Sequence, residues 1–286
     1  MRITDLPELS AADLAENDVV AVDHDTGNGI ETRQMTVADL LVMTIGGSAE
    51  DNAARHNMVY RGKALGGSVT SEQWAAIKTG TFKDLYLGDY WSIGGVDYLI
   101  AAFNYWLACG DTGCTANHLL VVPRNNLYTA SMNGSKITTG GYVGSEMYKT
   151  GLAQAKTTIN SAFGSAHILN HRQVLVNTVT DGKSAGADWY NSTVELMNES
   201  MVYGGRQFSP MPDGRGPWDT CCNYTIDKSQ LPLFHLAPWL IHSRTWYWLR
   251  DVVFANGFAG VSGDGTPSCA TANVANGVRP VVGLIG

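Results

Sequence analysis

Two segments near the carboxyl terminus decide the fold: Tyr247-Trp248-Leu249-Arg250-Asp251 and Asn276-Gly277-Val278-Arg279-Pro280-Val281-Val282. Each is short and apolar and holds one arginine, and the residues between them are rich in Gly, Ser and Asn. Apolar flanks fix the ends of such a connection, and its polar residues are then free to take any contact chemistry. The pattern indicates a rigid scaffold that displays a contact surface.

The connection from Val252 to Ala275 is longer than the roughly 15 residues beyond which a loop between core strands is usually functional. Its small polar side chains and occasional aromatic rings are typical of adaptable binding surfaces, although an ordinary surface loop is the alternative. The residues predicted to contact a partner are Phe254, Asn256, Phe258, Asp264, Thr266, Ser268 and Asn273.

Arg250 and Arg279 each follow an apolar residue in a strand-like context. A half-buried arginine in a sheet usually bonds to several carbonyls or to a carboxylate, and Asp251 is one candidate partner. We therefore expect Arg250, Arg279 and the neighbouring Trp248 to brace the fold.

Composition sets the broad class. With 286 residues and 44% hydrophobic content, the chain can bury one large core or two smaller ones. Charged residues make up only 16%, which suits a surface partly covered by identical subunits. The sequence holds no basic stripe for nucleic acid, no apolar run that would insert in a membrane and no secretory h-region.

Charge divides the chain in two. Residues 1–60 carry a net charge of −8, whereas residues 61–286 carry +1. Within 1–45, the segments 18–23 and 30–37 predict a β-hairpin, followed by a short helix that starts near Thr36. Such a unit is not stable alone in water, so it needs copies of itself or a partner. We predict a unit at 1–45, a linker at 46–59 and a body at 60–286.

The body has an α+β pattern. Thr70 and Gln73 form a capping box for a helix that stops at Gly80, and strands follow between residues 84 and 122. Residues 145–163 have helical periodicity. Capping-box spacing predicts two further helices, at 170–179 and 193–197. Strands close the chain, and the absence of alternating βαβ units argues against a doubly wound sheet.

Two motifs could carry catalysis. Gly182-Lys183-Ser184-Ala185-Gly186 matches a nucleophile elbow, with Asp219 and His235 following in hydrolase order, but the preceding segment reads as helix rather than strand. Asp188, Glu195 and Glu199 form an acidic cluster beside Trp189 and Tyr190 that could serve a glycosidase. We interpret the first as a flexible loop and the second as a solvated helix face, so no catalytic residue is predicted.

The sequence gives little support for a metal site or for a disulfide. His167 and His171 have the spacing of a helical metal site, but a proposed helix cap lies between them. Cys109 and Cys114 flank a turn and could be reduced thiols, a disulfide or, with His118, part of a zinc site; reduced thiols fit best. Asp264 has no second carboxylate nearby for calcium. No metal and no cofactor is predicted.

Several stretches of the body resemble lectin-like modules at the ends of bacteriophage fibre proteins. The matching stretches are Gly88-Asp89-Tyr90-Trp91, Gly140-Gly141-Tyr142-Val143-Gly144-Ser145-Glu146-Met147, Glu195-Leu196-Met197 with Tyr203-Gly204, Tyr247-Trp248-Leu249-Arg250 and Gly277-Val278-Arg279-Pro280. The last two resemble core strands of the C-type-lectin-like fold, and residues 1–45 are similar to anchor units that begin many phage fibre proteins.

The resemblance implies a non-enzymatic virion protein, made in the bacterial host cytoplasm and assembled as a homotrimer. Residues 1–45 would dock on other virion proteins, and the terminal loops would bind a host surface glycan or protein. The Glu-Pro-Asn, Gln-Pro-Asp and Trp-Asn-Asp motifs of calcium-dependent lectins are missing, so calcium-mediated sugar binding is not implied. The alternatives are a head decoration or collar protein that never touches a receptor, and a virion glycosidase using Glu195 or Glu199.

Overall fold

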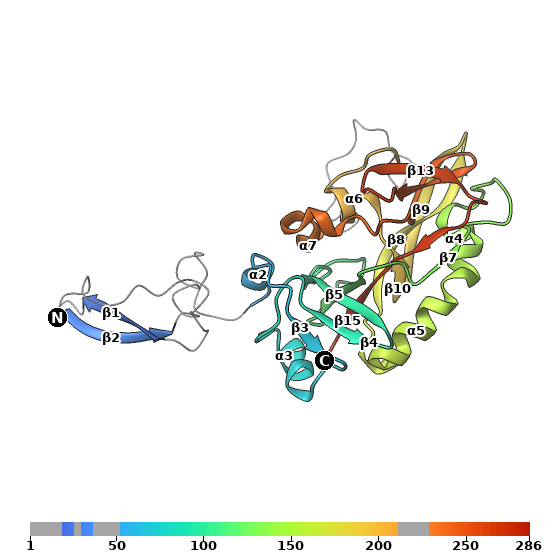
Figure 1. The fold of residues 1–286 in the computed structure, drawn as a ribbon. Helices are drawn as coiled ribbons and strands as arrows, with labels where there is room; N and C mark the ends of the chain where they lie inside the picture. Colours follow the sequence, from blue (N-terminus) through green and yellow to red (C-terminus); the bar gives the residue numbers. More distant parts are fainter. Residues whose placement is uncertain (1–18, 26–29, 37–51, 211–228) are drawn as a thin grey trace. The chain divides into compact units, whose positions relative to one another are not determined.

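The computed structural model describes residues 19–25, 30–36, 52–210 and 229–286 (Figure 1). The chain divides into two compact units, Met1–Asp51 and Asn52–Gly286. The first contains the predicted hairpin, in which β1 (Val19–Asp25) pairs antiparallel with β2 (Ile30–Thr36). The helix expected after Thr36 lies outside the described residues.

The body begins earlier than predicted. Asn52, placed in the linker by the sequence, accepts a hydrogen bond from the backbone N–H of Arg55 (3.2 Å) and caps helix α2 (Ala53–His56). The His56 side chain is fully buried against Phe82 and Phe103. Because these residues pack into the core, the linker cannot extend to residue 59.

The body has a mixed α+β fold, as the sequence predicts. Its largest sheet has the strand order β10-β15-β6-β5-β4-β3, and a second sheet has the order β13-β12-β11-β14-β7. Most neighbours are antiparallel, but β3–β4 and β11–β14 are parallel. The strands of the first sheet are β3 (Ala64–Gly66), β4 (Tyr90–Ile93), β5 (Val96–Phe103), β6 (Leu119–Pro123), β10 (Val194–Leu196) and β15 (Pro280–Leu284). Those of the second are β7 (Tyr128–Ala130), β11 (Tyr247–Phe254), β12 (Gly257–Val261), β13 (Pro267–Thr271) and β14 (Asn276–Val278).

A separate two-stranded ribbon, β8 (His171–Thr180) with β9 (Lys183–Ser192), packs beside the second sheet. The helical elements of the body are α2, α3 (Ser71–Thr79), α4 (Gly141–Gly144), a π-helical turn (Met147–Gly151), α5 (Ala153–Phe163), a 3₁₀ turn (Ser165–His167), α6 (Glu199–Tyr203), α7 (Pro232–Leu236) and the 3₁₀ turn η4 (Pro238–Leu240). In the described part of the chain, no helix combines the length and the apolar character that a membrane span requires.

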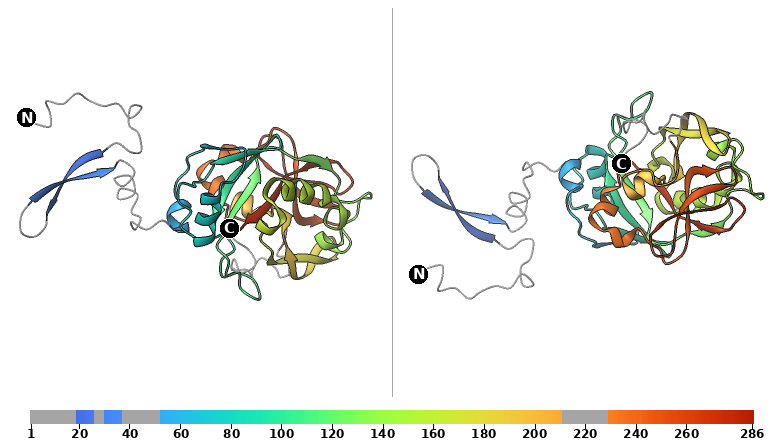
Figure 2. Two further views of the ribbon diagram at one scale, coloured as in Figure 1. Left: turned by 90° about the horizontal axis from the view of Figure 1, so that it is seen from below. Right: turned by 90° about the horizontal axis from the view of Figure 1, so that it is seen from above.

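Two of the predicted helices are confirmed. Thr70 and Gln73 exchange the two hydrogen bonds of a capping box at the start of α3, at 3.0 and 3.2 Å, and α3 ends at Gly80 in the left-handed conformation. The helix predicted over 145–163 is present as the π turn followed by α5. The carboxyl terminus lies against α3, since a Cβ on Gly286 would meet the Trp74 carbonyl at 2.0 Å (Figures 1 and 2).

Two other predicted helices are wrong. Of residues 170–179, all but Asn170 lie in strand β8, and 193–197 contain strand β10. In β8 the buried residues alternate as His171, Gln173 and Leu175, which is the period of a strand. Polar residues occupy two of those inward positions, so hydropathy alone hides the alternation. The true helix cap in this region is Asn198, which accepts from Met201 N (2.8 Å) at the start of α6.

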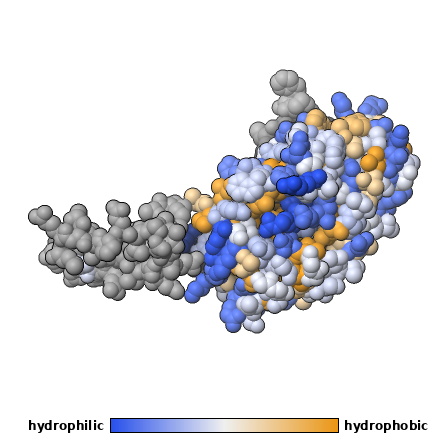
Figure 3. Space-filling model, viewed as in Figure 1, coloured by the Kyte–Doolittle hydropathy of each residue, from blue (hydrophilic) through white to orange (hydrophobic). Residues whose placement is uncertain are grey.

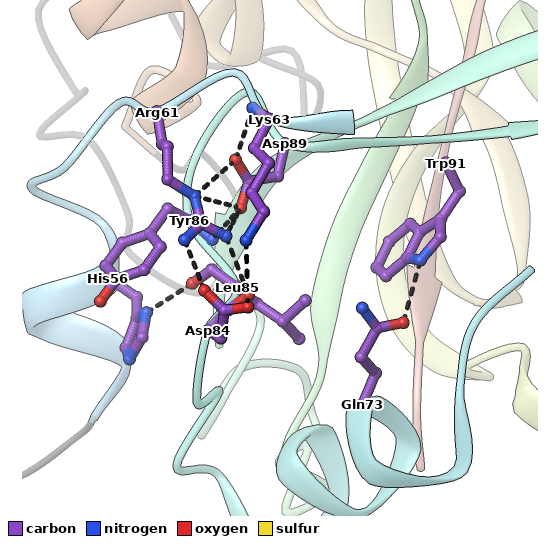
Figure 4. Close-up of polar contacts among 9 residues, drawn as sticks. All are labelled: His56, Arg61, Lys63, Gln73, Asp84, Leu85, Tyr86, Asp89 and Trp91. Atoms are coloured by element: carbon purple, nitrogen blue, oxygen red, sulfur yellow. Dashed lines mark hydrogen bonds and ion pairs between the residues drawn. The ribbon is translucent and has the colours of Figure 1, made fainter. Parts of the chain in front are cut away.

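The buried carboxylate of Asp89 attaches residues 61–63 to the turn before β4 (Figure 4). Asp89 is fully buried and accepts hydrogen bonds from the Arg61 guanidinium (2.7 Å), from Lys63 N (2.9 Å) and from Tyr86 N (2.8 Å). The same guanidinium reaches Asp84 (2.5 Å) and lies 4.6 Å from the centre of the Tyr86 ring. Asp89 therefore joins residues 61–63 to the turn that precedes β4.

Replacing this carboxylate should weaken the fold. In Asp89→Asn the amide cannot accept all of these bonds, and the Arg61 guanidinium keeps only the more exposed Asp84 as its charge partner, so we expect a loss of about 3 kcal/mol in urea unfolding. Asp97→Asn is the matched control, because Asp97 pairs with Arg124 at 3.1 Å but keeps 35% of its side-chain surface exposed. That variant should lose less than about 1 kcal/mol. Equal losses in the two variants would contradict the assigned role of Asp89.

Candidate contact surface

The Arg279 side chain is the most constrained polar group near the predicted contact region. It is fully buried and donates to three carbonyls: Nε to Pro123 (2.8 Å), Nη1 to Ile241 (2.8 Å) and Nη2 to Leu240 (3.0 Å). Its guanidinium also lies over the rings of Phe234 and Tyr247, at 5.5 and 5.2 Å. Burial lowers the pKa of Arg279, but the carbonyls satisfy its donors. These are the contacts expected of a bracing arginine.

Trp248 and Arg250 lie beside it on β11. Trp248 is fully buried and donates from its indole nitrogen to the Ala130 carbonyl (2.9 Å). Arg250 donates to the Gln173 side chain (2.5 Å) on β8, not to its neighbour Asp251. Asp251 instead accepts from Glu199 N (2.7 Å) and from Arg206 (3.3 Å). The proposed Arg250–Asp251 pair is thus wrong, because successive strand residues point to opposite faces of the sheet.

The predicted connection between Val252 and Ala275 is not one loop. It contains the end of β11 and all of β12 and β13, which pair antiparallel in register from Gly257↔Thr271 to Val261↔Pro267. Phe258 is fully buried in the core, so it cannot contact a partner. The small residues that suggested a loop instead let backbones approach closely. A Cβ at Gly260, for example, would lie 2.9 Å from the Tyr247 carbonyl.

The other predicted contact residues separate along these strands. Asp264 and Thr266 are exposed in the turn between β12 and β13. Exposed Asn273 and half-buried Asn256 lie at the opposite end of the same strands. The five residues of β12 put roughly 17 Å between the two ends. Half-buried Ser268 lies on β13, and half-buried Phe254 packs its ring against Gly257.

The Asp264 turn is held by its own side chains. The Asp264 carboxylate accepts from the Ser262 hydroxyl and from Thr266 N (3.0 Å). These bonds lower the pKa of Asp264 to about 2, and the bond from Ser262 has the largest effect. Tyr203 donates to the Gly265 carbonyl (3.1 Å), which attaches the turn to α6. The Asp264 carboxylate therefore accepts hydrogen bonds within its own turn.

Four turns meet at the other end of the sheet, and we call residues 133–138, 181–182, 255–256 and 272–275 the loop face. Main-chain bonds connect them: Thr138 N donates to the Ala255 carbonyl (3.1 Å) and Asn133 N to the Ala272 carbonyl (2.9 Å). The Thr138 hydroxyl donates to the same Ala255 carbonyl (2.9 Å). A Cβ at Gly182 would lie 2.6 Å from Ala255 N, so the β8–β9 turn touches the same point.

The loop face exposes two aliphatic side chains, Ile137 (48%) and Val274 (42%), among small polar residues. Residues 133–138 and 181–182 are not among the contact residues predicted from the sequence. Their signal is the dipeptides Asn133-Gly134 and Asp181-Gly182, which, like Asn256-Gly257, are strong turn formers. Asp181 and Gly182 both have positive φ, as a two-residue hairpin turn requires. Elsewhere on the molecule, Figure 3 shows apolar residues in separate patches between hydrophilic ones.

The carboxylates considered for glycosidase chemistry are used internally. Glu195 is buried on β10, accepts from the Tyr142 hydroxyl (2.7 Å) and Ser192 (3.3 Å), and has its pKa raised by burial. Glu199 is buried on α6 and accepts from the backbone N–H groups of residues 207, 208 and 209 at 3.1 Å. The predicted solvated helix face is therefore wrong. Exposed Asp188 accepts from the adjacent Trp189 N (2.7 Å).

The remaining candidates are also dispersed. Ser184 lies on β9 of the antiparallel ribbon rather than at a strand-to-helix turn, and Asp219 lies outside the described residues. His167 stacks on Trp74 at 3.8 Å, whereas His171 stacks on Trp106 at 3.7 Å. Within residues 52–210 and 229–286, together with the hairpin, no three His, Cys, Asp or Glu side chains group as metal ligands. Cys114 and Cys269 are free thiols, so Cys109 and Cys114 are not bridged.

His118 is held neutral by its hydrogen bonds. Its Nε2 accepts from Trp106 N (3.0 Å), so Nδ1 carries the proton and donates to the Ala116 carbonyl (2.8 Å). Burial lowers the pKa of His118 to about 4 and that of His171 to about 3. Since both values lie below the unfolded value of about 6.5, the unfolded chain binds these protons first as the pH falls.

Because Phe258 is buried and Asn273 is exposed, alanine substitution should change the unfolding free energy differently at the two positions. Phe258→Ala removes a fully buried ring and should cost about 3–5 kcal/mol of unfolding free energy. Asn273→Ala changes an exposed turn residue and should stay within about 0.5 kcal/mol. Urea unfolding of both variants measures the difference. A stable Phe258→Ala protein would mean that this ring is not in the core.

Stability should also fall with acidity through His118. The stability that neutral His118 contributes is fully present above pH 6.5 and is lost as the pH falls to about 4. The unfolding free energy should fall by about 3 kcal/mol over this range. Burial raises the pKa of Asp251 to about 6, so that carboxyl contributes in the opposite direction over the same range. The comparison is therefore between the wild type and His118→Gln, which share Asp251. Unfolding free energy should depend less steeply on pH in the variant between pH 6.5 and 4, and identical slopes would contradict the role of His118.

Comparison of the chain with protein-family models, curated proteins and solved structures finds no match. Its function is therefore inferred from its own residues and their arrangement.

Proposed function

We propose that this chain is a bacteriophage fibre protein that attaches the virion to the host cell surface through the loop face. In this proposal, the unit 1–51 docks on other virion proteins, the chain assembles as a homotrimer, and the body is a C-type-lectin-like domain. The fibre resemblance of the sequence supports the virion assignment. The division of the chain into a small first unit and a large compact body is consistent with an anchor and a binding module.

The observation that carries the proposal is the construction of the loop face. Its turns come from four separate parts of the chain, yet backbone groups of residues 133, 255, 256 and 272 bond them to one another. A surface fixed in this way loses little conformational entropy when it binds. Ile137 and Val274 present apolar area to solvent there, which contributes to binding only if a partner covers it.

A binding role also agrees with the placement of the acidic side chains. Glycoside hydrolysis requires two carboxylates that face one substrate. Glu195 and Glu199 are buried, and their oxygens accept hydrogen bonds from the protein itself. These residues support the fold, and the glycosidase alternative gains nothing from their geometry.

Weak contacts suffice for attachment if several copies act together. Once one copy is bound, its sister copies bind as an intramolecular event, and avidity can exceed single-site affinity by roughly 10²–10⁴ without new contacts. A homotrimer on a fibre meets this condition. The proposal therefore requires only a small loop face on each copy.

Polar substitutions on the loop face should reduce cell binding. We expect the fluorescently labelled full-length double variant Ile137→Ser, Val274→Ser to coat host cells at least about tenfold less than the wild type, because two apolar contacts are lost. Flow cytometry with the propagating host measures this. Phe208→Ser is the matched control, since Phe208 is 50% exposed but lies outside the loop face.

Unchanged melting temperatures in all variants would exclude unfolding as the cause. If the wild-type protein does not coat cells at all, the proposal fails in favour of a structural virion component such as a head decoration or collar protein. If it coats cells and the double variant coats them equally, attachment occurs through another surface.

A further inference from the structure

An exposed aromatic pair lies on the body away from any role described so far. Trp239, on the 3₁₀ turn η4, is 55% exposed, and Tyr60, just before β3, is 36% exposed. Their rings meet almost at right angles, with 5.6 Å between centroids and 83° between planes. The pair thus forms a corner with aromatic surface exposed to solvent, whereas Trp91 and Trp248 are fully buried.

The backbone fixes both rings before any ligand arrives. The Tyr60 ring lies over Gly88, where a Cβ would come within 2.2 Å of it, and Gly88 also has a positive φ of 77°. On the other side, buried Leu240 donates its N–H to the Ala237 carbonyl (2.9 Å) and fixes the turn that carries Trp239. Rigid aromatic side chains bind with a small entropic cost.

Each ring also offers a polar group. In the described part of the chain, neither the Tyr60 hydroxyl nor the Trp239 indole N–H has a hydrogen-bond partner, whereas the indole nitrogens of Trp91 and Trp248 each donate to a protein oxygen. The corner therefore combines exposed aromatic surface with one donor and one donor–acceptor. It matches a ligand that has an apolar face and a hydroxylated rim.

The small area of the aromatic pair and the charges near it limit which class of ligand fits. A stable protein interface needs about 800 Å² from each partner, far more than two side chains provide, whereas a single sugar ring has the dimensions of an aromatic face. A cation can bind over an aromatic face, and excess negative charge nearby would favour it further. The nearby charges are instead balanced, because Arg61 pairs with Asp89 and Lys63 with Asp84.

We propose that Tyr60 and Trp239 form a carbohydrate subsite in which the apolar face of a neutral hexose stacks on the indole and its hydroxyls bond to the Tyr60 hydroxyl and the indole N–H. The subsite is separate from the loop face. It rests on the proposed function only in that a virion attachment protein meets host surface glycans.

The test measures sugar binding directly on the full-length protein. Saturation-transfer NMR is recorded with the methyl glycosides of glucose, galactose, mannose and N-acetylglucosamine, and with choline as the cationic probe. We expect at least one glycoside to bind and choline not to bind. Trp239→Ala should weaken glycoside binding about tenfold or more, and Tyr60→Phe, which keeps the ring but removes the hydroxyl, should weaken it less.

Trp246→Ala is the control, because Trp246 is similarly exposed at 43% but belongs to a different segment. The subsite is overturned if none of the glycosides binds, if choline binds instead, or if Trp239→Ala and Trp246→Ala have the same effect. These outcomes are independent of cell binding through the loop face. A protein that coats cells but binds no sugar refutes the subsite alone, and one that binds sugar but does not coat cells refutes the proposed function alone.

Discussion

The fold depends on the point where the chain passes from one sheet to the other. Strand β14 belongs to the five-stranded sheet and β15 to the six-stranded sheet, and Arg279 is the single residue between them. The Arg279 guanidinium at this point donates to three carbonyls of other segments, at Pro123, Leu240 and Ile241. Its planar fork presents three separate nitrogens to these acceptors, whereas a lysine would have to reach them from a single nitrogen.

This joint also explains how a rigid surface can be built from turns. Because β14 and β11 are held at one end, the strands that follow β11 can pair in fixed register and place their turns reproducibly. Trp248 then connects β11 to the edge strand β7 of the same sheet. Arg250 connects the sheet to β8, and Asp251 connects it to α6. The loop face is rigid because the strands beneath it are connected on several sides, not because its own residues are bulky.

Local signals in the sequence predicted the parts of this arrangement that depend on local chemistry. The capping box at Thr70 and Gln73, the β1–β2 hairpin and the two arginine-containing strands follow from side chains that act within a few residues. The same type of signal failed at Asn170 and Ser192, where pairing between β8 and β9 and between β10 and β15 overrides the capping preference. Helix propensity is worth less than about 1 kcal/mol per residue, so a paired strand with a buried face prevails.

The contact surface could be predicted only in part, for a related reason. Small residues such as Gly257, Gly260 and Ser268 have the composition of a loop, but in β12 and β13 they permit close backbone approach. The turns that do reach the surface come from four parts of the chain, and only Asn256 and Asn273 of the predicted set lie among them. Convergence of distant turns is a property of the tertiary fold, and no window of the sequence contains it.

The buried carboxylates of the body stabilise the fold. Glu199 accepts from three consecutive backbone N–H groups and from the Ser209 hydroxyl (2.6 Å), so it organises residues 207–209 as a secondary-structure element would. A carboxylate used in this way cannot also act on a substrate, because its lone pairs are occupied and removing it would release the segment. Glu199, which resembled a catalytic group in the sequence, thus takes the place of regular secondary structure for residues 207–209, which have none. In the proposed function, recognition is left to the neutral side chains at the surface.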